Sequence, residues 1–343
     1  MGDLPLPSHF ILPDVPGLTA HAFDFKHNDH QDDARPQAEA WFASMNAYHG
    51  KKLAKFMSFR FDNLAGAGFP QADFIRELWC INFLYWAFSF DDLTDIGEFQ
   101  RDSQTVRVGV EISRKVFENT LTCTAPKPQY PYAAMLHDIW DEVLRYATPG
   151  CCGRFQQGVE HWFDSLPVQC SNRDIDYILP VDEFIAVRRR TVGGAMTMAI
   201  VEYALRIDLP DHVFQNPVIM AMHEAIIDFM TWPNDLCSFN KEQADSDFQN
   251  LVLCVMKERQ LELQDAIYYI VQMIRDRLEE YLALKASVPS FGAEVDKEFA
   301  RYVNGLEQFV QGCVDWYYSS RYFRDLDLSN HVDLVVPVFP RGS

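Results

Sequence analysis

Three carboxylates end a long apolar run in residues 91–95, Asp-Asp-Leu-Thr-Asp. On a helix, Asp91 and Asp95 are four residues apart, so they share one face with Cβ atoms roughly 5–6 Å apart, while Asp92 points to the side. Two carboxylates this close repel each other unless a cation lies between them. Oxygen ligands select a hard cation, and Mg²⁺ takes one or two carboxylates and completes its shell with water and phosphate oxygens. The stretch therefore predicts a Mg²⁺ site, although an acidic cluster at a helix end is more often simply solvated.

A second polar stretch, residues 232–242, offers another set of oxygen ligands. Its sequence is Trp-Pro-Asn-Asp-Leu-Cys-Ser-Phe-Asn-Lys-Glu, in which Asn234, Ser238 and Glu242 follow at intervals of four residues. On a helix these side chains form one stripe of an amide oxygen, a hydroxyl and a carboxylate. Such a stripe suits a hard cation better than a hydrophobic core, so we predict a second metal site here.

Together, the two stretches resemble the paired metal motifs of class I terpene synthases, DDxxD and NDxxSxxxE. The resemblance covers nearly the whole chain and is closest to fungal, basidiomycete-type sesquiterpene synthases. It implies an all-α, single-domain helical bundle around a central apolar cavity. It also implies that the protein ionises farnesyl diphosphate, cyclises the carbocation to a C15 hydrocarbon or alcohol and releases diphosphate. Three Mg²⁺ ions, for which Mn²⁺ can substitute, are expected as cofactors.

The resemblance also implies roles for individual residues. Asp91 would bridge metal ions, with Asp95 secondary, and Asn234, Ser238 and Glu242 would hold another ion. Basic and phenolic groups would bind the diphosphate: Arg188, Lys241, Arg321 and Tyr322.

Two of these assignments have rivals in the sequence. Arg188 is followed directly by Arg189 and Arg190, either of which could be the diphosphate-binding arginine instead. The dipeptide Arg301-Tyr302 repeats the pair at 321–322 but falls within a long predicted helix, so we interpret it as structural. A triple arginine is most often a solvated helix face, and only the family's order of motifs favours the functional interpretation.

The carbocation requires a dry apolar wall and aromatic faces that stabilise positive charge. Phe61, Phe88 and Trp316 are our candidates, and Phe88 lies one helical turn before Asp91. With 26 Phe, 14 Tyr and 7 Trp in the chain, ordinary core packing is an equally good explanation for each of them.

Periodicity and Gly/Pro positions predict an all-α chain without useful strand alternation. Residues 1–35, rich in proline, are expected to be an extended N-terminal arm, 36–330 the helical domain, and 331–343 a tail whose last residues resemble a protease-site remnant. A break is expected at Gly193-Gly194 and a bend at Trp232-Pro233. The helices are expected at about 36–64, 71–95, 103–119, 133–147, 150–167, 181–205, 210–240, 242–258, 260–286 and 292–320.

Composition excludes several function classes. The 343 residues carry a net charge of −19, which disfavours nucleic acid and anionic membrane surfaces as partners. The longest apolar run, Leu78 to Phe90, is too short to span a bilayer. Eight cysteines without zinc-like spacing, and no signal peptide, favour a reducing, cytoplasmic location. The protein is expected to be a monomer or a homodimer.

Other polar clusters are not interpreted as metal sites. His137-Asp138 with Asp141-Glu142, and His223-Glu224, lack HExxH spacing and fit exposed helix faces. The members of the pairs Asp174/Asp176 and Asp245/Asp247 are two residues apart and do not face each other on a helix.

Two alternative functions remain open. A chain-elongating prenyl diphosphate synthase shares the fold and metal chemistry, but it normally carries a second Asp-rich motif where this chain has Asn, Ser and Glu. A non-catalytic helical scaffold would need neither the two sets of hard-cation ligands nor the arginines.

Overall fold

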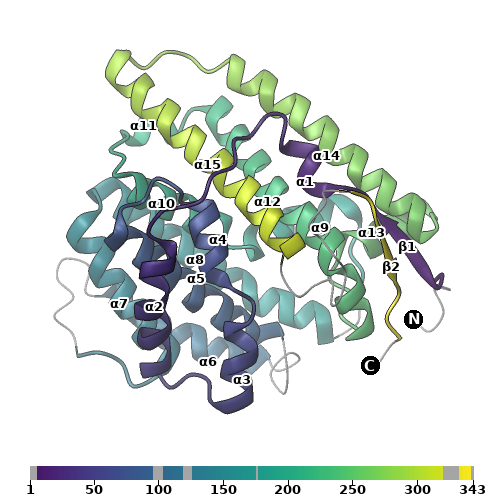
Figure 1. Ribbon diagram of the computed structural model, residues 1–343, viewed down its shortest axis with the longest axis horizontal. Coiled ribbons are helices and arrows are strands. Elements are labelled where there is room, and N and C mark those ends of the chain that lie inside the picture. The colour runs from purple at the N-terminus through teal and green to yellow at the C-terminus, as the bar shows by residue number, and fades with distance from the viewer. Residues whose placement is uncertain (1–5, 96–102, 119–125, 175–176, 320–331, 341–343) are drawn as a thin grey trace.

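The computed structural model describes residues 6–95, 103–118, 126–174, 177–319 and 332–340, and these are predominantly helical (Figure 1). The all-α expectation is confirmed, apart from one short strand pair. In chain order the helices are α1 (Val15–Thr19), α2 (Gln31–Ser44), α3 (Gly50–Met57), α4 (Phe61–Gly68), α5 (Phe74–Asp95), α6 (Ser103–Arg114), the 3-10 turn η1 (Lys115–Glu118), α7 (Pro131–Tyr146), α8 (Pro149–Asp174), α9 (Val181–Thr191), α10 (Gly194–Leu205), α11 (Asp211–Phe214), α12 (Pro217–Ala244), α13 (Leu251–Arg259), α14 (Leu263–Ala286) and α15 (Ala293–Ser319).

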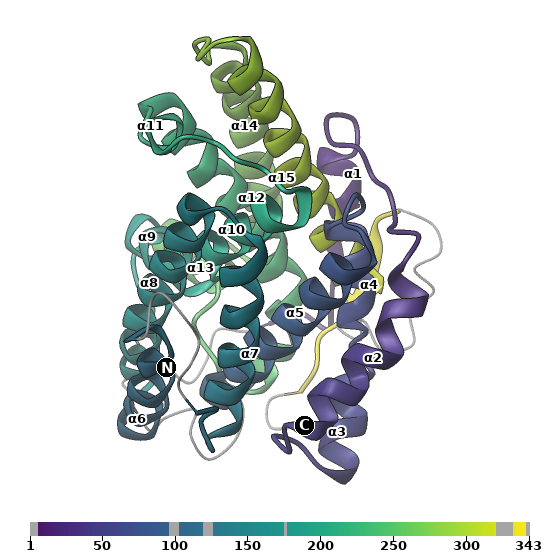
Figure 2. The ribbon, with the colours of Figure 1, turned by 90° about the vertical axis from the view of Figure 1, so that its left-hand side faces the viewer.

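Helix α5 lies inside the bundle. Its middle part, Cys80 to Phe90, is apolar on nearly every side, and a helix of this kind must be covered all round. It packs against α2, α4, α7 and α10, and Figure 2 shows it between α7 and α4. This burial fixes the position of the acidic end of α5.

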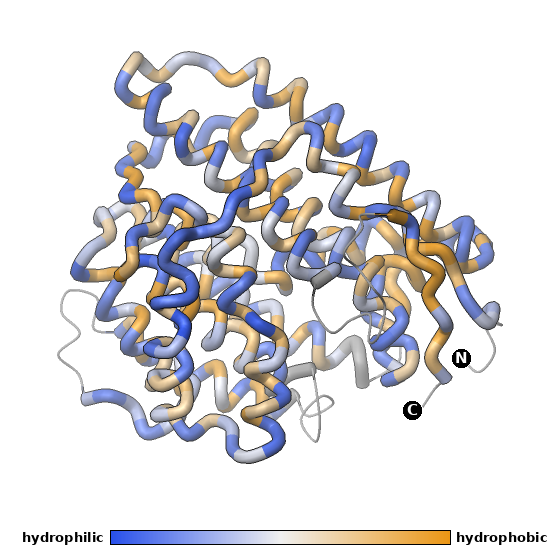
Figure 3. Tube along the Cα trace, in the orientation of Figure 1, coloured by the Kyte–Doolittle hydropathy of each residue, from blue (hydrophilic) through white to orange (hydrophobic). Residues whose placement is uncertain are grey.

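Helix α12 is the second organising element and packs against α9, α13, α14 and α15. The covering helices are amphipathic: α14 buries residues at intervals of three and four, including Leu263, Ile267, Ile270 and Ile274. Figure 3 shows the corresponding alternation of hydrophobic and hydrophilic blocks along the outer helices. Since one face of each outer helix is apolar, both motif-bearing helices are enclosed by packing.

The ends of the described chain form a two-stranded antiparallel ribbon. Strand β1 (His9–Leu12) pairs with β2 (Leu334–Pro337), with Leu12 opposite Leu334. The expectation of no strands was therefore wrong here, and residues 6–35 hold β1, α1 and the first turn of α2 instead of a plain extended arm. Strands of four residues, paired across more than 300 positions, leave no local alternation by which they could be recognised.

Several helix boundaries also differ from expectation: for example, α8 continues to Asp174 instead of ending near residue 167, and the helix expected at 210–240 is divided into α11 and α12. The predicted helix at 36–64 is divided into α2, α3 and α4, because Asn46 and Arg60 adopt left-handed backbone conformations with φ of 56°. Pro36 lies inside α2 instead of at its start. The predicted helix at 242–258 begins only at Leu251, so residues 245–250 form a loop. Among the described helices, none is long and apolar enough to cross a membrane.

Glu77 of α5 is fully buried, and neither carboxylate oxygen has a hydrogen-bond partner among the described residues. Burial, assisted by the negative charge of Asp62, raises the pKa of Glu77 from 4.5 to about 8. Between about pH 4.5 and about pH 8, the carboxyl group of Glu77 is protonated in the folded protein but ionised in the unfolded chain. The free energy of unfolding therefore falls as the pH rises from about 4.5 to about 8.

Glu77→Gln, which is neutral at every pH, should raise the melting temperature by several degrees at about pH 8.5 and change it little at about pH 5. Circular dichroism melts at the two pH values test this. Glu294→Gln, at an exposed position of α15, is the control and should shift neither value. An equal shift at both pH values for Glu77→Gln would contradict the prediction.

Candidate active site

The acidic end of α5 lines a cavity of about 180 Å³. Asp91 and Asp92 are both half-buried in its wall, so Asp92 does not simply point away as expected. The hydroxyl of Tyr48, in the segment between α2 and α3, lies 3.1 Å from Asp92 Oδ2 and 3.2 Å from the carbonyl oxygen of Ser89. Asp95 ends α5, but its side chain lies outside the described part, so its predicted position beside Asp91 is untested.

The second motif lies near the end of α12, and Asn234, Lys241 and Glu242 line the same cavity. Ser238, between them on the predicted stripe, is only 1% exposed, and its Oγ has no hydrogen-bond partner among the described residues. An unpaired buried hydroxyl is costly unless some further ligand engages it. The helix is assigned without interruption through Pro233, where a bend was expected.

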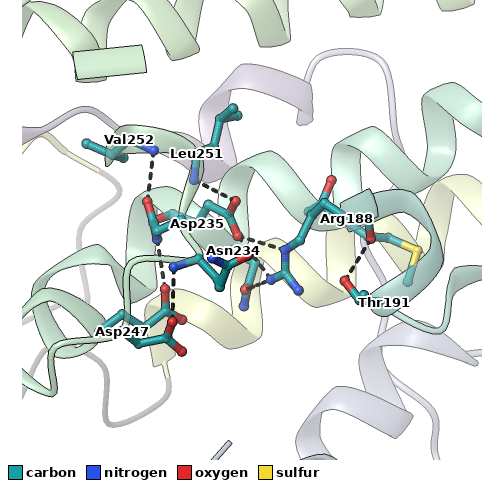
Figure 4. Close-up of polar contacts among 12 residues, drawn as sticks. Arg188, Thr191, Asn234, Asp235, Asp247, Leu251 and Val252 are labelled. Atoms are coloured by element: carbon teal, nitrogen blue, oxygen red, sulfur yellow. Dashed lines mark hydrogen bonds and ion pairs between the residues drawn. The ribbon is translucent and has the colours of Figure 1, made fainter. Parts of the chain in front are cut away.

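Arg188, in the last turn of α9, bonds to the second motif on α12 (Figure 4). Its Nε donates to Asp235 Oδ1 at 3.0 Å, and its Nη2 donates to Asn234 Oδ1 at 2.8 Å. Burial alone would lower the pKa of the guanidinium, but the surrounding carboxylates, Asp235 first, hold it above its ordinary value. Arg188 therefore stays charged beside the candidate metal ligands.

The other two arginines of the triplet lie elsewhere. Arg189 donates through Nε and Nη2 to the buried carboxylate of Asp228, each at 2.7 Å, and Arg190 is exposed. Of the three, Arg188 lines the cavity. Directly after this turn the chain breaks as predicted: Gly193 has φ of +70°, a left-handed conformation that glycine adopts without strain, and α10 begins at Gly194.

The loop at 245–250 completes the polar side. Asn250 Nδ2 donates to Glu242 Oε2 at 2.9 Å, and Asp247 and Gln249 line the cavity. The pair Asp245/Asp247 was set aside because residues two apart do not face each other on a helix, but the segment is not helical and Ser246 has φ of 60°. Asp247 is only 8% exposed.

These donors fit a hard cation. Burial, together with the nearby carboxylates of Asp247 and Asp235, raises the pKa of Glu242 from 4.5 to about 7, so positive charge at this position would be stabilising. The donor atoms are carboxylate, amide and hydroxyl oxygens, with Ser238 Oγ still to be satisfied. Within the described residues, no group of three or more His, Cys, Asp or Glu gathers as a metal cluster, so an ion here would depend on Asn234 and Ser238 as well.

The predicted aromatic wall is assembled in the structure. The rings of Phe61 and Phe88 stack with centroids 4.4 Å apart, and Trp316 lies 5.4 Å from Phe61 and 5.5 Å from Phe88. All three line the cavity. Trp316 Nε1 donates to the carbonyl oxygen of Phe59 at 2.8 Å, which fixes the indole ring.

The remaining predicted residues have different outcomes. Arg321 and Tyr322 lie outside the described residues. Arg301 and Tyr302 lie within α15, where Arg301 donates to the carbonyl oxygen of Leu205 and Tyr302 is buried against His223, so their structural interpretation is supported.

The His/Asp/Glu clusters at 137–142 and 223–224 were expected on exposed helix faces, and this was wrong for two of their residues. Glu142 is buried and accepts a hydrogen bond from Tyr203 at 2.7 Å, and His223 is partly buried.

Sequence reasoning missed Tyr48, Asp235, Asp247 and Asn250. Asp235 directly follows Asn234 in the second motif, and this position was the only sequence feature that pointed to it. The other three reach the site from turns and loops that the hydrophobic period does not place.

Comparison with known proteins gives consistent matches. The family model described as terpene synthase family 2, C-terminal metal binding, matches residues 82–280. Sesquiterpene synthase Agr1 of Cyclocybe aegerita is 30% identical, over 95% of this chain and 93% of the relative. Alpha-muurolene synthase of Coprinopsis cinerea is 30% identical, over 93% of this chain and 75% of the relative. The crystal structure of a-eudesmol synthase, 20% identical, superposes with a TM-score of 0.79 over 87% of this chain and 98% of the other, which indicates a shared fold.

Proposed function

Because the chain belongs to the terpene synthase family and is a class I sesquiterpene cyclase, we propose that its substrate is farnesyl diphosphate and its divalent metal is Mg²⁺. The observation that carries this proposal is a cavity with hard-cation ligands and Arg188 in one part of its wall and stacked aromatic rings in another. Along α5, Phe83, Ala87 and Asp91 line it at intervals of four residues, a depth of about 12 Å at 1.5 Å per residue. The lining thus changes from apolar at Phe83 to acidic at Asp91, which suits an amphipathic substrate with an apolar chain and an anionic head bound through metal ions.

The reaction begins when the bond between C1 of the farnesyl chain and the diphosphate oxygen breaks, and its electron pair leaves with the diphosphate. Bound Mg²⁺, with three ions proposed and Mn²⁺ able to substitute, supplies positive charge that stabilises this leaving group. Asp91, Asn234, Ser238 and Glu242 would hold the metal, and Arg188 and Lys241 would bind the diphosphate oxygens directly. Asp95 as a further metal ligand, and Arg321 and Tyr322 as further diphosphate-binding residues, are proposed from their sequence motifs alone.

The aromatic part of the cavity wall would stabilise the organic cation. Phe61, Phe88 and Trp316 turn aromatic surface toward the cavity, and cation–π contacts of this kind are worth about 2 kcal/mol each when desolvated. The apolar side chains around them keep water away from the cation until ring closure is complete. Loss of a proton then yields a hydrocarbon, and capture of water yields an alcohol.

Incubation with farnesyl diphosphate, followed by gas chromatography–mass spectrometry, tests the proposal. A cyclic C15 product should appear with Mg²⁺ and should be abolished by a chelator. Turnover of geranyl or geranylgeranyl diphosphate in place of farnesyl diphosphate would correct the substrate. A longer prenyl diphosphate formed with isopentenyl diphosphate, or no product from any of these, would overturn the proposal.

A further inference from the structure

The strand ribbon is held at both edges by side-chain amides. On the β1 edge, Gln264 of α14 accepts a hydrogen bond from the Ile11 N–H at 2.7 Å and donates to the Ile11 carbonyl oxygen at 2.9 Å. On the β2 edge, Asn240 of α12 donates to the Pro337 carbonyl oxygen and accepts from the Phe339 N–H, both at 2.8 Å. Each amide therefore acts as a neighbouring strand would, and the ribbon joins α14 to α12 (Figure 1).

A second amide strengthens the α12 edge. Gln243 Nε2 donates to the Phe339 carbonyl oxygen at 2.8 Å and to the Asn240 carbonyl oxygen at 3.1 Å. Asn240 and Gln243 are each 2% exposed. Beside them, the rings of Phe10 in β1 and Phe239 in α12 meet edge to face with centroids 5.9 Å apart. The docking surface thus combines buried hydrogen bonds with apolar packing.

The ribbon lies behind the candidate metal ligands. Asn240 is two residues from Ser238 and two from Glu242, which places it roughly 160° away around the helix at 3.6 residues per turn. Glu242 lines the cavity, whereas Asn240 and Gln243 bond to the ribbon. Glu242 is two residues from Ala244, where α12 ends, and the last turn of a helix is where internal hydrogen bonds run out and fraying begins.

The ribbon is also anchored independently of α12. The Tyr318 hydroxyl of α15 bonds to the Pro13 carbonyl oxygen and accepts from the Val15 N–H at 3.2 Å, and the Asp14 N–H donates to Asp333 Oδ1 at 3.0 Å. Because Tyr318 of α15 anchors the ribbon without Gln264, the contacts with Asn240 and Gln243 should still hold the last turns of α12 when Gln264 is replaced.

We propose that Asn240 and Gln243 are positioning residues, which fix Ser238 and Glu242 for metal binding by docking the C-terminal strand onto the back of α12. This inference rests on the proposed function, since it assigns a purpose to the two residues only if α12 carries a metal site. It makes segments near both ends of the chain part of the support for that site. Groups that hydrogen-bond directly to metal ligands typically change metal affinity by 10–100-fold, and the less direct support from Asn240 and Gln243 should act at the lower end of that range.

Asn240→Ala and Gln264→Ala form a matched pair, because each removes one amide and two hydrogen bonds from one edge of the same ribbon. The probe is Mn²⁺ with inorganic diphosphate, and unbound Mn²⁺ is measured by electron paramagnetic resonance. Asn240→Ala should weaken Mn²⁺ binding by about tenfold, whereas Gln264→Ala should stay within about twofold of the unmodified protein. Circular dichroism melts should show a similar loss of stability for both variants.

A second readout separates positioning from general damage. The Mg²⁺ concentration for half-maximal turnover should rise for Asn240→Ala, while kcat at saturating Mg²⁺ largely recovers. If Asn240→Ala does not fold, Gln243→Met decides in its place, since it removes the two donated bonds at nearly constant volume.

The outcomes are distinguishable. Equal Mn²⁺ affinity in the Asn240 and Gln264 variants, with strong binding by the unmodified protein, would overturn the positioning role and leave the proposed function intact. No Mn²⁺ binding by the unmodified protein would overturn both.

Discussion

Asp91→Asn should lower kcat with farnesyl diphosphate by about 10²–10³-fold at saturating Mg²⁺, a loss typical of removing one group that stabilises developing charge. Asn has nearly the same shape as Asp but no negative charge, and hard divalent cations prefer carboxylates. Asp91 lines the cavity one helical turn beyond Phe88, and its charge already contributes to the raised pKa of Arg188. It is therefore close to both the aromatic wall and the basic group that would bind the diphosphate.

The measurement is steady-state turnover over a range of Mg²⁺ concentrations, with thermal melts to confirm folding. The substitution removes one charge from an acidic region, so the melting temperature should not fall. Asp141→Asn, which disrupts only a surface pair with Arg145 on α7, is the control and should leave kcat within about twofold. Retention of more than about a tenth of the original kcat by Asp91→Asn would contradict a metal-binding role for Asp91.

Asp92→Asn distinguishes the two carboxylates of the motif. The Tyr48 hydroxyl already engages Asp92 Oδ2, so this carboxylate has a structural partner that an asparagine oxygen can also satisfy. We therefore expect a smaller loss of kcat than for Asp91→Asn. A larger loss would reverse the order of importance that the sequence suggested.

The two motif-bearing helices could be predicted from the sequence because their signals are local. Apolar residues covering every face of α5 predict burial, and a spacing of four residues predicts that Asn234, Ser238 and Glu242 share a face. The break before α10 could also be predicted, because the adjacent glycines Gly193 and Gly194 disfavour a continuous helix. The three candidate aromatic residues, Phe61, Phe88 and Trp316, do line the cavity, although sequence alone could not separate them from other core aromatics.

The rest of the site depends on tertiary placement. Tyr48 reaches Asp92 only because the chain turns between α2 and α3, at a left-handed Asn46 inside a segment whose hydrophobic period continues without a break. Asp247 and Asn250 belong to a loop that was predicted as helix, so rules about side-chain positions on a helix do not apply to them. The ribbon joins segments more than 300 residues apart, and no local pattern records such a pairing.

The adjacent arginines Arg188 and Arg189 provide the sharpest test of which basic group acts in the reaction. Each lies in the last turn of α9, and each donates to a fully buried aspartate, Asp235 for Arg188 and Asp228 for Arg189. They differ in direction: Arg188 also bonds Asn234 and lines the cavity, whereas Asp228 receives a further bond from Arg277. Lysine keeps the charge but cannot reproduce two directed guanidinium bonds, so both substitutions should cost roughly 1–3 kcal/mol of stability.

Catalysis should separate the two variants. Arg188→Lys should lower kcat by about 10²-fold, because a point charge on a flexible stem replaces a fixed donor that bonds Asn234 and that we propose also binds the diphosphate. Arg189→Lys should leave kcat within about threefold, since its partners lie outside the cavity and its loss is one of stability. Turnover and melting temperature, measured side by side, decide between them. Equal losses of kcat in both variants would mean that either substitution disturbs the last turn of α9 as a whole. That result would contradict a specific diphosphate-binding role for Arg188.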